Sequence, residues 1–251
     1  MLIVEQLTIE NRHHRLLNNA NFTVKRGECL AIIGASGSGK SILANALLGA
    51  LPQGFRQQGT VKFKIADKNS IEINSIAIVA QAATTLNPST CVGSQILQQA
   101  NSSKNTPAQL AITLQQASLE PDILTLYPDQ LSGGMAKRVL TAMALIQNTD
   151  FIIADEPTCG LELSRSNKVF SELAALCQSD NIHPAKGVII ISHDLPGIVQ
   201  VAHRILVLKD GHIVDNTTPA AIRQGIANAY TQALWDASPA NWTRNCNAKA
   251  S

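Results

Sequence analysis

The chain has 251 residues, of which 45% are hydrophobic and 15% charged, and its formal net charge is +2. This composition excludes a disordered chain, and the small charge without a Lys or Arg block predicts that nucleic acid is not a partner. No apolar run approaches the roughly 20 residues needed to span a bilayer, and the five scattered cysteines indicate reduced thiols. One domain with an inserted or appended lobe is expected.

The hydrophobic pattern distinguishes two kinds of strand. Residues 2–10 and 61–68 alternate apolar and polar side chains, which is typical of half-exposed strands. Four continuous apolar runs suit strands buried on both faces of a parallel sheet: Cys29–Gly34, Ile76–Gln81, Phe151–Glu156 and Gly187–His193. Helical patterns lie between them at Ser41–Leu48, Lys137–Ile146 and Arg165–Cys177. This alternation predicts an α/β fold with a largely parallel sheet.

A different composition marks the middle of the chain. Residues 84–130 are rich in Gln, Ser, Asn and Ala, lack buried-strand runs and include the helix-compatible segment Pro107–Ala117. We therefore expect a mostly helical lobe at about 84–135, inserted between two halves of an α/β core that extends over residues 1–220. Residues 221–251 are expected to form a short helical extension and a polar tail.

A glycine-rich loop follows the first buried strand. Its sequence GASGSGKS fits G-x-x-x-x-G-K-[ST], and it lies between a strand and a helix as the motif requires. Glycines let backbone N–H groups turn toward phosphate oxygens, while Lys40 can reach the β- and γ-phosphates and the Ser41 hydroxyl can bind Mg²⁺. A Gly/Ser-rich turn is the alternative, and the strand-helix context disfavours it. The residues expected to bind nucleotide are Gly34, Ala35, Ser36, Gly37, Ser38, Gly39, Lys40 and Ser41.

Two acids end the third buried run. At the carboxyl edge of a parallel sheet, Asp155 can hold Mg²⁺ directly or through water, and Glu156 can polarise an attacking water as general base. His193 ends the next strand run and could contact the γ-phosphate. In isolation these residues would be interpreted as solvated acids and a packed or surface histidine. Beside a phosphate loop, the catalytic interpretation is favoured.

The order of motifs resembles that of ATP-binding cassette (ABC) ATPases. The phosphate loop, Gln81 after a strand, LSGGM at Leu131–Met135, the Asp155–Glu156 pair and His193 occur in that family's order. The resemblance covers roughly residues 1–220. It implies a RecA-like phosphate-loop core with an antiparallel β subdomain and an inserted helical lobe, and ATP with Mg²⁺ as its ligands.

The same resemblance implies that the chain acts as half of a dimer. Ser132, Gly133 and Gly134 would bind the γ-phosphate of ATP held by the partner cassette, and a Gly-Gly pair at a helix start offers N–H groups to an anion. Gln81 would contact Mg²⁺ and the attacking water.

Shorter motifs resemble the peptide/nickel importer ATPases of bacteria: LNPS, YPDQLSGGMAKRV, IADEPT and SHDL. The short segment after Pro219 is similar to the nickel-type branch and implies import of nickel or a metal chelate, with dipeptide or oligopeptide import as the alternative. The implied partners are a second ATPase subunit that is a paralogue, two membrane permease subunits and a substrate-binding protein, at the cytoplasmic face of the bacterial membrane. A non-transport ABC ATPase and a non-hydrolysing ATP-binding module are further alternatives.

Two departures from the family pattern stand out. No aromatic residue occurs between Thr8 and Arg15 to stack on adenine, although a cation or imidazole from the basic segment 12–14 could do so, which predicts modest nucleotide selectivity. A solvated basic turn is the alternative. Glu162 stands where the family has Asp at the contact between cassettes, and it keeps the charge but adds a methylene.

Overall fold

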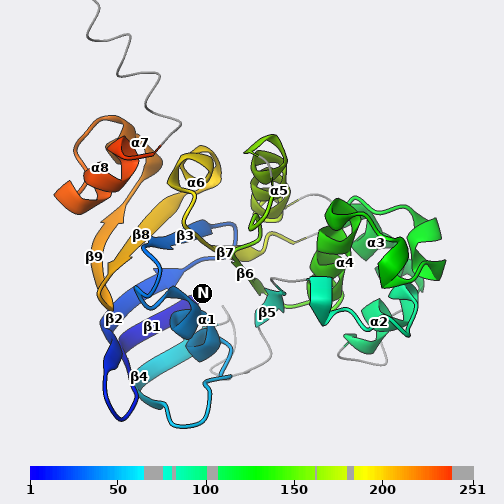
Figure 1. Cartoon of the computed structure of the whole chain (residues 1–251), viewed down its shortest axis with the longest axis horizontal. Coiled ribbons are helices and arrows are strands. Elements are labelled where there is room, and N and C mark those ends of the chain that lie inside the picture. The colour runs from blue at the N-terminus through cyan, green and yellow to red at the C-terminus, as the bar shows by residue number, and fades with distance from the viewer. Residues whose placement is uncertain (65–75, 81–82, 101–106, 162, 180–183, 239–251) are drawn as a thin grey trace, which may run out of the picture.

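The computed structural model describes residues 1–64, 76–80, 83–100, 107–161, 163–179 and 184–238. Two sheets with their covering helices lie on one side of the molecule, and a helical lobe lies on the other (Figure 1). Among the described residues, no helix is both long and apolar enough to cross a membrane.

A six-stranded sheet forms the centre of the core, with the strand order β5-β6-β7-β3-β8-β9. Pairing is parallel from β5 to β8, and only β9 is antiparallel to its neighbour. Its strands are β3 (Cys29–Gly34), β5 (Ile76–Val79), β6 (Phe151–Asp155), β7 (Gly187–Ser192), β8 (Arg204–Lys209) and β9 (His212–Thr217). Every residue of β3 and β7 is buried, as continuous apolar runs require when both faces of a sheet are covered.

A three-stranded antiparallel sheet covers one face of this core. It has the order β2-β1-β4 and consists of β1 (Leu2–Glu10), β2 (Arg15–Val24) and β4 (Arg56–Phe63). β4 begins earlier than the hydrophobic pattern predicts, because backbone pairing with β1 extends it through polar residues such as Gln57 and Gln58. Of the expected strand at residues 61–68, positions 65–68 lie outside the described residues.

Helices complete both faces. α1 (Lys40–Leu47) packs with the antiparallel sheet, whereas α5 (Leu163–Ala175) and α6 (Leu195–Val201) cover the opposite face (Figure 1). The lobe contains α2 (Val92–Gln98), α3 (Pro107–Gln116), α4 (Gly133–Leu145) and 3₁₀ turns at Ala83–Thr85, Pro121–Thr125 and Pro128–Gln130. After β9 come α7 (Pro219–Arg223) and α8 (Ala229–Asp236).

The side chains of β3 divide between two hydrophobic cores, because successive residues of a strand point to opposite faces. Leu30 and Ile32 join the core beneath the antiparallel sheet, and Ala31 and Ile33 join the core beneath α5, α6 and the lobe. This double burial fixes the position of the loop that leaves β3.

Candidate functional site

The phosphate loop connects β3 to α1, and its glycines adopt conformations that other residues rarely adopt. Gly37 has φ of 79° and Gly39 has φ of 105°. A Cβ on Gly39 would lie 2.6 Å from the carbonyl oxygen of Leu16, and one on Gly34 would lie 2.4 Å from that of Leu208. The loop therefore approaches neighbouring backbone so closely that glycine is required at these two positions.

Backbone hydrogen bonds hold the loop in place. The Ser38 N–H donates to the Ala35 carbonyl at 3.1 Å, and the Gly211 N–H, from the turn between β8 and β9, donates to the Ser38 carbonyl at 3.2 Å. The Ser38 hydroxyl oxygen is buried and has no hydrogen-bond partner in the described part of the chain. The loop is therefore held in place by backbone hydrogen bonds, while its Ser38 hydroxyl oxygen stays unpaired among the described residues.

Lys40 lies within this loop. Its Nζ donates hydrogen bonds to the carbonyl oxygens of Gly34 at 2.8 Å and Ala35 at 3.0 Å, and only 8% of the residue is exposed. Burial lowers the pKa of Lys40, while the nearby carboxylates of Glu156 and Asp155 raise it. The ammonium group is therefore placed beside both acids and at the start of α1.

Asp155 ends β6 and supplies a half-buried carboxylate whose Oδ1 is buried. Its Oδ1 has no hydrogen-bond partner among the described residues. Burial, followed by repulsion from Glu156, raises the pKa of Asp155, whereas a hydrogen bond with Ser41 and the charge of Lys40 lower it. A buried, unpaired carboxylate oxygen beside a hydroxyl is a donor set that suits Mg²⁺, which prefers oxygen ligands.

Glu156 and His193 form the next layer of the site. The distance between His193 Nδ1 and Glu156 Oε2 is 2.9 Å, and their side chains are 72% and 18% exposed, respectively. β6 and β7 are neighbours, and the Glu156 N–H donates to the Ile191 carbonyl at 2.9 Å. This hydrogen bond holds the end of β6 beside the end of β7. Glu156 itself has φ of 48°, a left-handed conformation that turns the chain sharply after the strand.

Most of the site residues described above line one cavity of about 710 Å³. It is lined by Leu16, Ser36, Gly37, Gly39, Lys40, Ser41, Ile42, Glu156, Cys159 and His193. Leu16, Ile42 and Cys159 were not predicted as site residues. Gln81 and Glu162 lie outside the described residues.

Ser132, Gly133 and Gly134 do not line this cavity. The Ser132 hydroxyl caps α4 by accepting a hydrogen bond from the Met135 N–H at 3.2 Å, which is why the helix begins at Gly133 and not at Lys137. All three residues are exposed, and a Cβ on either glycine would meet nothing within 4 Å. The start of α4 is therefore open to a partner and separate from the chain's own phosphate loop.

Lys137 links the start of α4 to the segment that follows β6. Its Nζ donates to the carbonyl oxygens of Pro157 at 2.9 Å and Cys159 at 3.0 Å, in the segment that follows Glu156. Burial lowers the pKa of Lys137.

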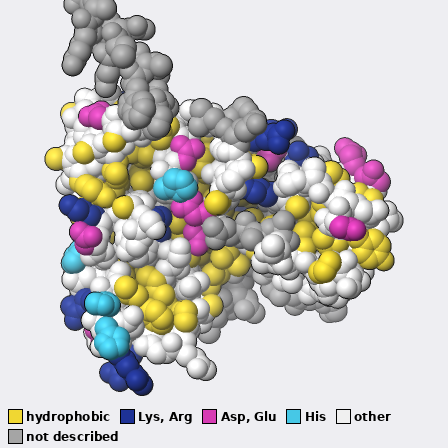
Figure 2. Space-filling model, viewed as in Figure 1, with side chains coloured by type: hydrophobic (Ala, Val, Ile, Leu, Met, Phe, Trp, Pro, Cys, Tyr) yellow, Lys and Arg dark blue, Asp and Glu magenta, His cyan; other side chains and the backbone are white. Residues whose placement is uncertain are grey.

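A second cavity, of about 650 Å³, lies at the turn between β1 and β2. Arg12, His13 and His14 line it together with Phe55, and the Asn11 side chain accepts hydrogen bonds from the N–H groups of both histidines. Figure 2 shows histidine and basic side chains gathered at this end of the antiparallel sheet. Phe55 was missed by the sequence analysis because it is far from the turn in sequence and belongs to the segment before β4.

Comparison with known proteins identifies the family. The ABC transporter family model matches residues 17–159, which extend from the start of β2 to just beyond Glu156. The chain therefore belongs to the ABC transporter family, as the motif order predicted, and is an ATP-binding ABC-type transport ATPase.

Two curated relatives match over nearly the whole chain. The dipeptide transport ATP-binding protein DppD of Escherichia coli (strain K12) is 32% identical over 260 residues, covering 95% of this chain and 78% of that protein. The glutathione import ATP-binding protein GsiA of the same strain is 31% identical over 266 residues, covering 95% of this chain and 42% of that protein.

Solved structures confirm the predicted fold class. A dimeric ATP-binding cassette, solved in a post-hydrolysis state bound to ADP and Pi, superposes with a TM-score of 0.69 and is 26% identical. The similarity covers 87% of this chain and 99% of that one.

Proposed function

We propose that the chain is the ATP-hydrolysing subunit of a bacterial ABC importer and that its own site residues carry the chemistry as predicted. The observation that carries this proposal is the convergence of Lys40, Asp155, Glu156 and His193 at one edge of the sheet. The strand order β6-β7-β3 brings together the ends of three strands that are far apart in sequence. Ligands of open α/β sheets bind at such an edge.

In the proposed reaction, Glu156 accepts a proton from the water that attacks the γ-phosphorus, and the bond between the γ-phosphorus and the bridging oxygen breaks to leave ADP and phosphate. His193 contacts Glu156 through Nδ1, so its Nε2 is the nitrogen available to the γ-phosphate. Lys40 moves its hydrogen bonds from the loop carbonyls to phosphate oxygens, where its charge balances theirs.

Asp155 and Ser41 would hold Mg²⁺, and Gln81 is proposed as a further ligand from the family pattern. Bound with ATP, Mg²⁺ would neutralise phosphate charge. The unpaired Asp155 Oδ1 supports this assignment, because burial without a partner is otherwise unfavourable for a carboxylate.

We propose further that Ser132, Gly133 and Gly134 contact ATP on a second cassette, which we expect to be a paralogue. Their exposure at the capped start of α4, away from the chain's own phosphate loop, supports a role across an interface. Two permease subunits and a substrate-binding protein would complete the importer, with this subunit at the cytoplasmic face of the membrane.

Short peptides are the cargo that the two relatives favour, since one is named for dipeptide transport and the other for glutathione import. Nickel or a metal chelate is the second candidate, from the resemblance of the motifs to the peptide/nickel importer ATPases. Co-purification of the binding protein from membranes, followed by calorimetry with dipeptides, Ni²⁺ and Ni²⁺ chelates, distinguishes the two: peptide binding without Ni²⁺ binding supports the first.

The catalytic assignment is tested by Glu156→Gln in the assembled transporter. We expect ATP hydrolysis at this chain's own site to fall by about 100-fold or more, because a general base contributes roughly 10²–10⁴-fold, while ATP binding persists and an ATP-stabilised cassette pair accumulates on size exclusion. Glu5→Gln, an exposed carboxylate on β1, is the matched control and should stay within about twofold of wild type. Hydrolysis by wild type no faster than by Glu156→Gln would reject the assignment.

A further inference from the structure

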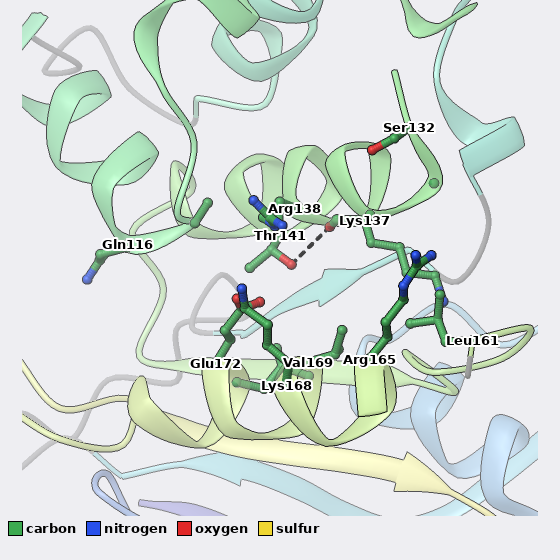
Figure 3. A pocket seen from close by; sticks show the side chains of 14 residues that line it. Gln116, Ser132, Lys137, Arg138, Thr141, Leu161, Arg165, Lys168, Val169 and Glu172 are labelled. Atoms are coloured by element: carbon green, nitrogen blue, oxygen red, sulfur yellow. Dashed lines mark hydrogen bonds between the residues drawn. The ribbon is translucent and has the colours of Figure 1, made fainter. Parts of the chain in front are cut away.

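A third cavity, of about 410 Å³, lies between α4 and α5 and is separate from the cavity around Lys40. In Figure 3, side chains of α4 face side chains of α5, with Gln116 at one end and Ser132 and Leu161 at the other. A cavity of this volume is within the range of small-molecule sites in proteins, roughly 300–1,000 Å³.

Positive charge dominates the walls of this α4–α5 cavity. Its cationic side chains are Lys137 and Arg138 from α4 and Arg165 and Lys168 from α5, against a single carboxylate, Glu172. Within the described ranges of the chain, no carboxylate forms an ion pair with any of these four cations. Lys137 and Arg138 donate instead to neutral carbonyls, which leaves their charges uncompensated.

Apolar side chains form the rest of the lining. Ala117, Val169 and Leu173 contribute to it, and Leu173 is only 3% exposed. Cations gathered around an apolar floor repel one another, and a ligand with several negative charges relieves that repulsion while its body covers the floor. The arrangement is complementary to a compact organic anion.

We propose that the α4–α5 cavity binds a small organic anion bearing at least two carboxylate or phosphate groups, and that this anion inhibits ATP hydrolysis. Inhibition follows because Ser132, Gly133 and Gly134 line the same cavity, so the anion occupies space next to the residues that meet the partner's nucleotide. This second part depends on the proposed function, whereas binding of the anion does not.

Binding is tested by calorimetry of the purified chain with phthalate, an aromatic dicarboxylate, and with phthalamide, its neutral analogue. We expect phthalate alone to bind, and Arg138→Gln combined with Lys168→Gln to weaken it about tenfold or more, since each removes a charge-assisted contact. Lys25→Gln with Lys64→Gln removes the same charge at exposed positions elsewhere and should not change the affinity. The exposed Lys168→Glu is the fallback if the double variant does not fold.

Phthalate could instead occupy the phosphate loop. Binding that is lost in Lys40→Ala but unchanged in the Arg138/Lys168 variants would overturn the site, and so would equal binding of phthalamide. In the assembled transporter, saturating phthalate should lower the ATPase rate at least about threefold, and Lys168→Glu should remove this inhibition. Binding without inhibition would overturn the regulatory part. A wild-type chain that binds phthalate but never hydrolyses ATP would contradict the proposed function and leave the site intact.

Discussion

Asp155 is half-buried, and its buried Oδ1 has no hydrogen-bond partner among the described residues, which suits it to a cation. Burial raises its pKa, so ionising Asp155 costs more free energy in the folded chain than in the unfolded chain. The charge therefore lowers stability once the pH has risen above the unfolded pKa. A bound cation offsets that cost.

Replacing Asp155 with Asn should stabilise the ligand-free chain at neutral pH. We expect the melting temperature to rise by about 2–4 °C, the shift for roughly 1 kcal/mol in a chain of this size. The gain should shrink as the pH falls through the raised folded pKa of Asp155, and it should vanish below about pH 4, where Asp155 becomes neutral in both states. Thermal melts from pH 4 to 8 measure this.

With saturating MgATP the order should reverse, because Asp155→Asn loses the stabilisation that bound ligand gives wild type, roughly 2.7 kcal/mol at 100 times Kd. Asp194→Asn is a poor control, since Asp194 caps α6. The exposed Asp129→Asn is suitable. A lower melting temperature for ligand-free Asp155→Asn would contradict the account.

At the scale of elements, the phosphate loop depends on two close backbone approaches. Gly39→Ala should destabilise the chain by about 2–4 kcal/mol, because its Cβ would collide with the Leu16 carbonyl and its φ of 105° disfavours any side chain. Gly37→Ala is the matched comparison: its Cβ would meet open space, and only its φ of 79° is unfavourable, at about 1 kcal/mol. Urea unfolding measures both, and equal losses would contradict the steric argument.

The C-terminal helices depend on one carboxylate. Asp215 Oδ2 accepts hydrogen bonds from the Asn228 N–H at 2.9 Å and from the fully buried Thr231 hydroxyl at 2.6 Å. Asp215→Ala should release α8, lowering stability by about 2–3 kcal/mol and increasing hydrogen exchange in residues 226–237. The exposed Asp129→Ala is the control, and unchanged exchange in α8 would show that apolar packing alone holds it.

Strands β1, β3, β5, β6 and β7 and the phosphate loop could be predicted because their signals are local, as in the apolar run of β3 and the glycine spacing directly after it. Strands β2, β8 and β9 were not predicted. The extension of β4 through polar residues and the place of Phe55 beside the basic turn could not be predicted, because both depend on pairing with β1 and on packing between distant segments. The roles assigned to Gln81 and Glu162 stay predictions.

At the scale of the whole molecule, the cavity around Lys40 and the start of α4 are separate surfaces, and in the proposed function a second cassette would complete each site. In a transporter whose own site is silenced by Glu156→Gln, the remaining hydrolysis belongs to the partner cassette. Adding Ser132→Arg should reduce that remainder at least about tenfold, because the bulky cation blocks the exposed start of α4. Single-turnover ATP hydrolysis measures it.

Ser171→Arg, an exposed position on α5, is the matched control and should leave the partner's hydrolysis unchanged. If Ser132→Arg also left it unchanged, the start of α4 would not act across the interface.

In the proposed pair of cassettes, the two hydrogen bonds from Lys137 would connect the two ATP sites. The Lys137 ammonium group joins the start of α4, which is proposed to meet the partner's ATP, with the segment just after Glu156. A shift of α4 on meeting the partner's phosphate would pull on the backbone that carries Glu156. The two hydrolytic events in such a pair would then be cooperative and not independent, and the Hill coefficient of ATP hydrolysis would report this coupling.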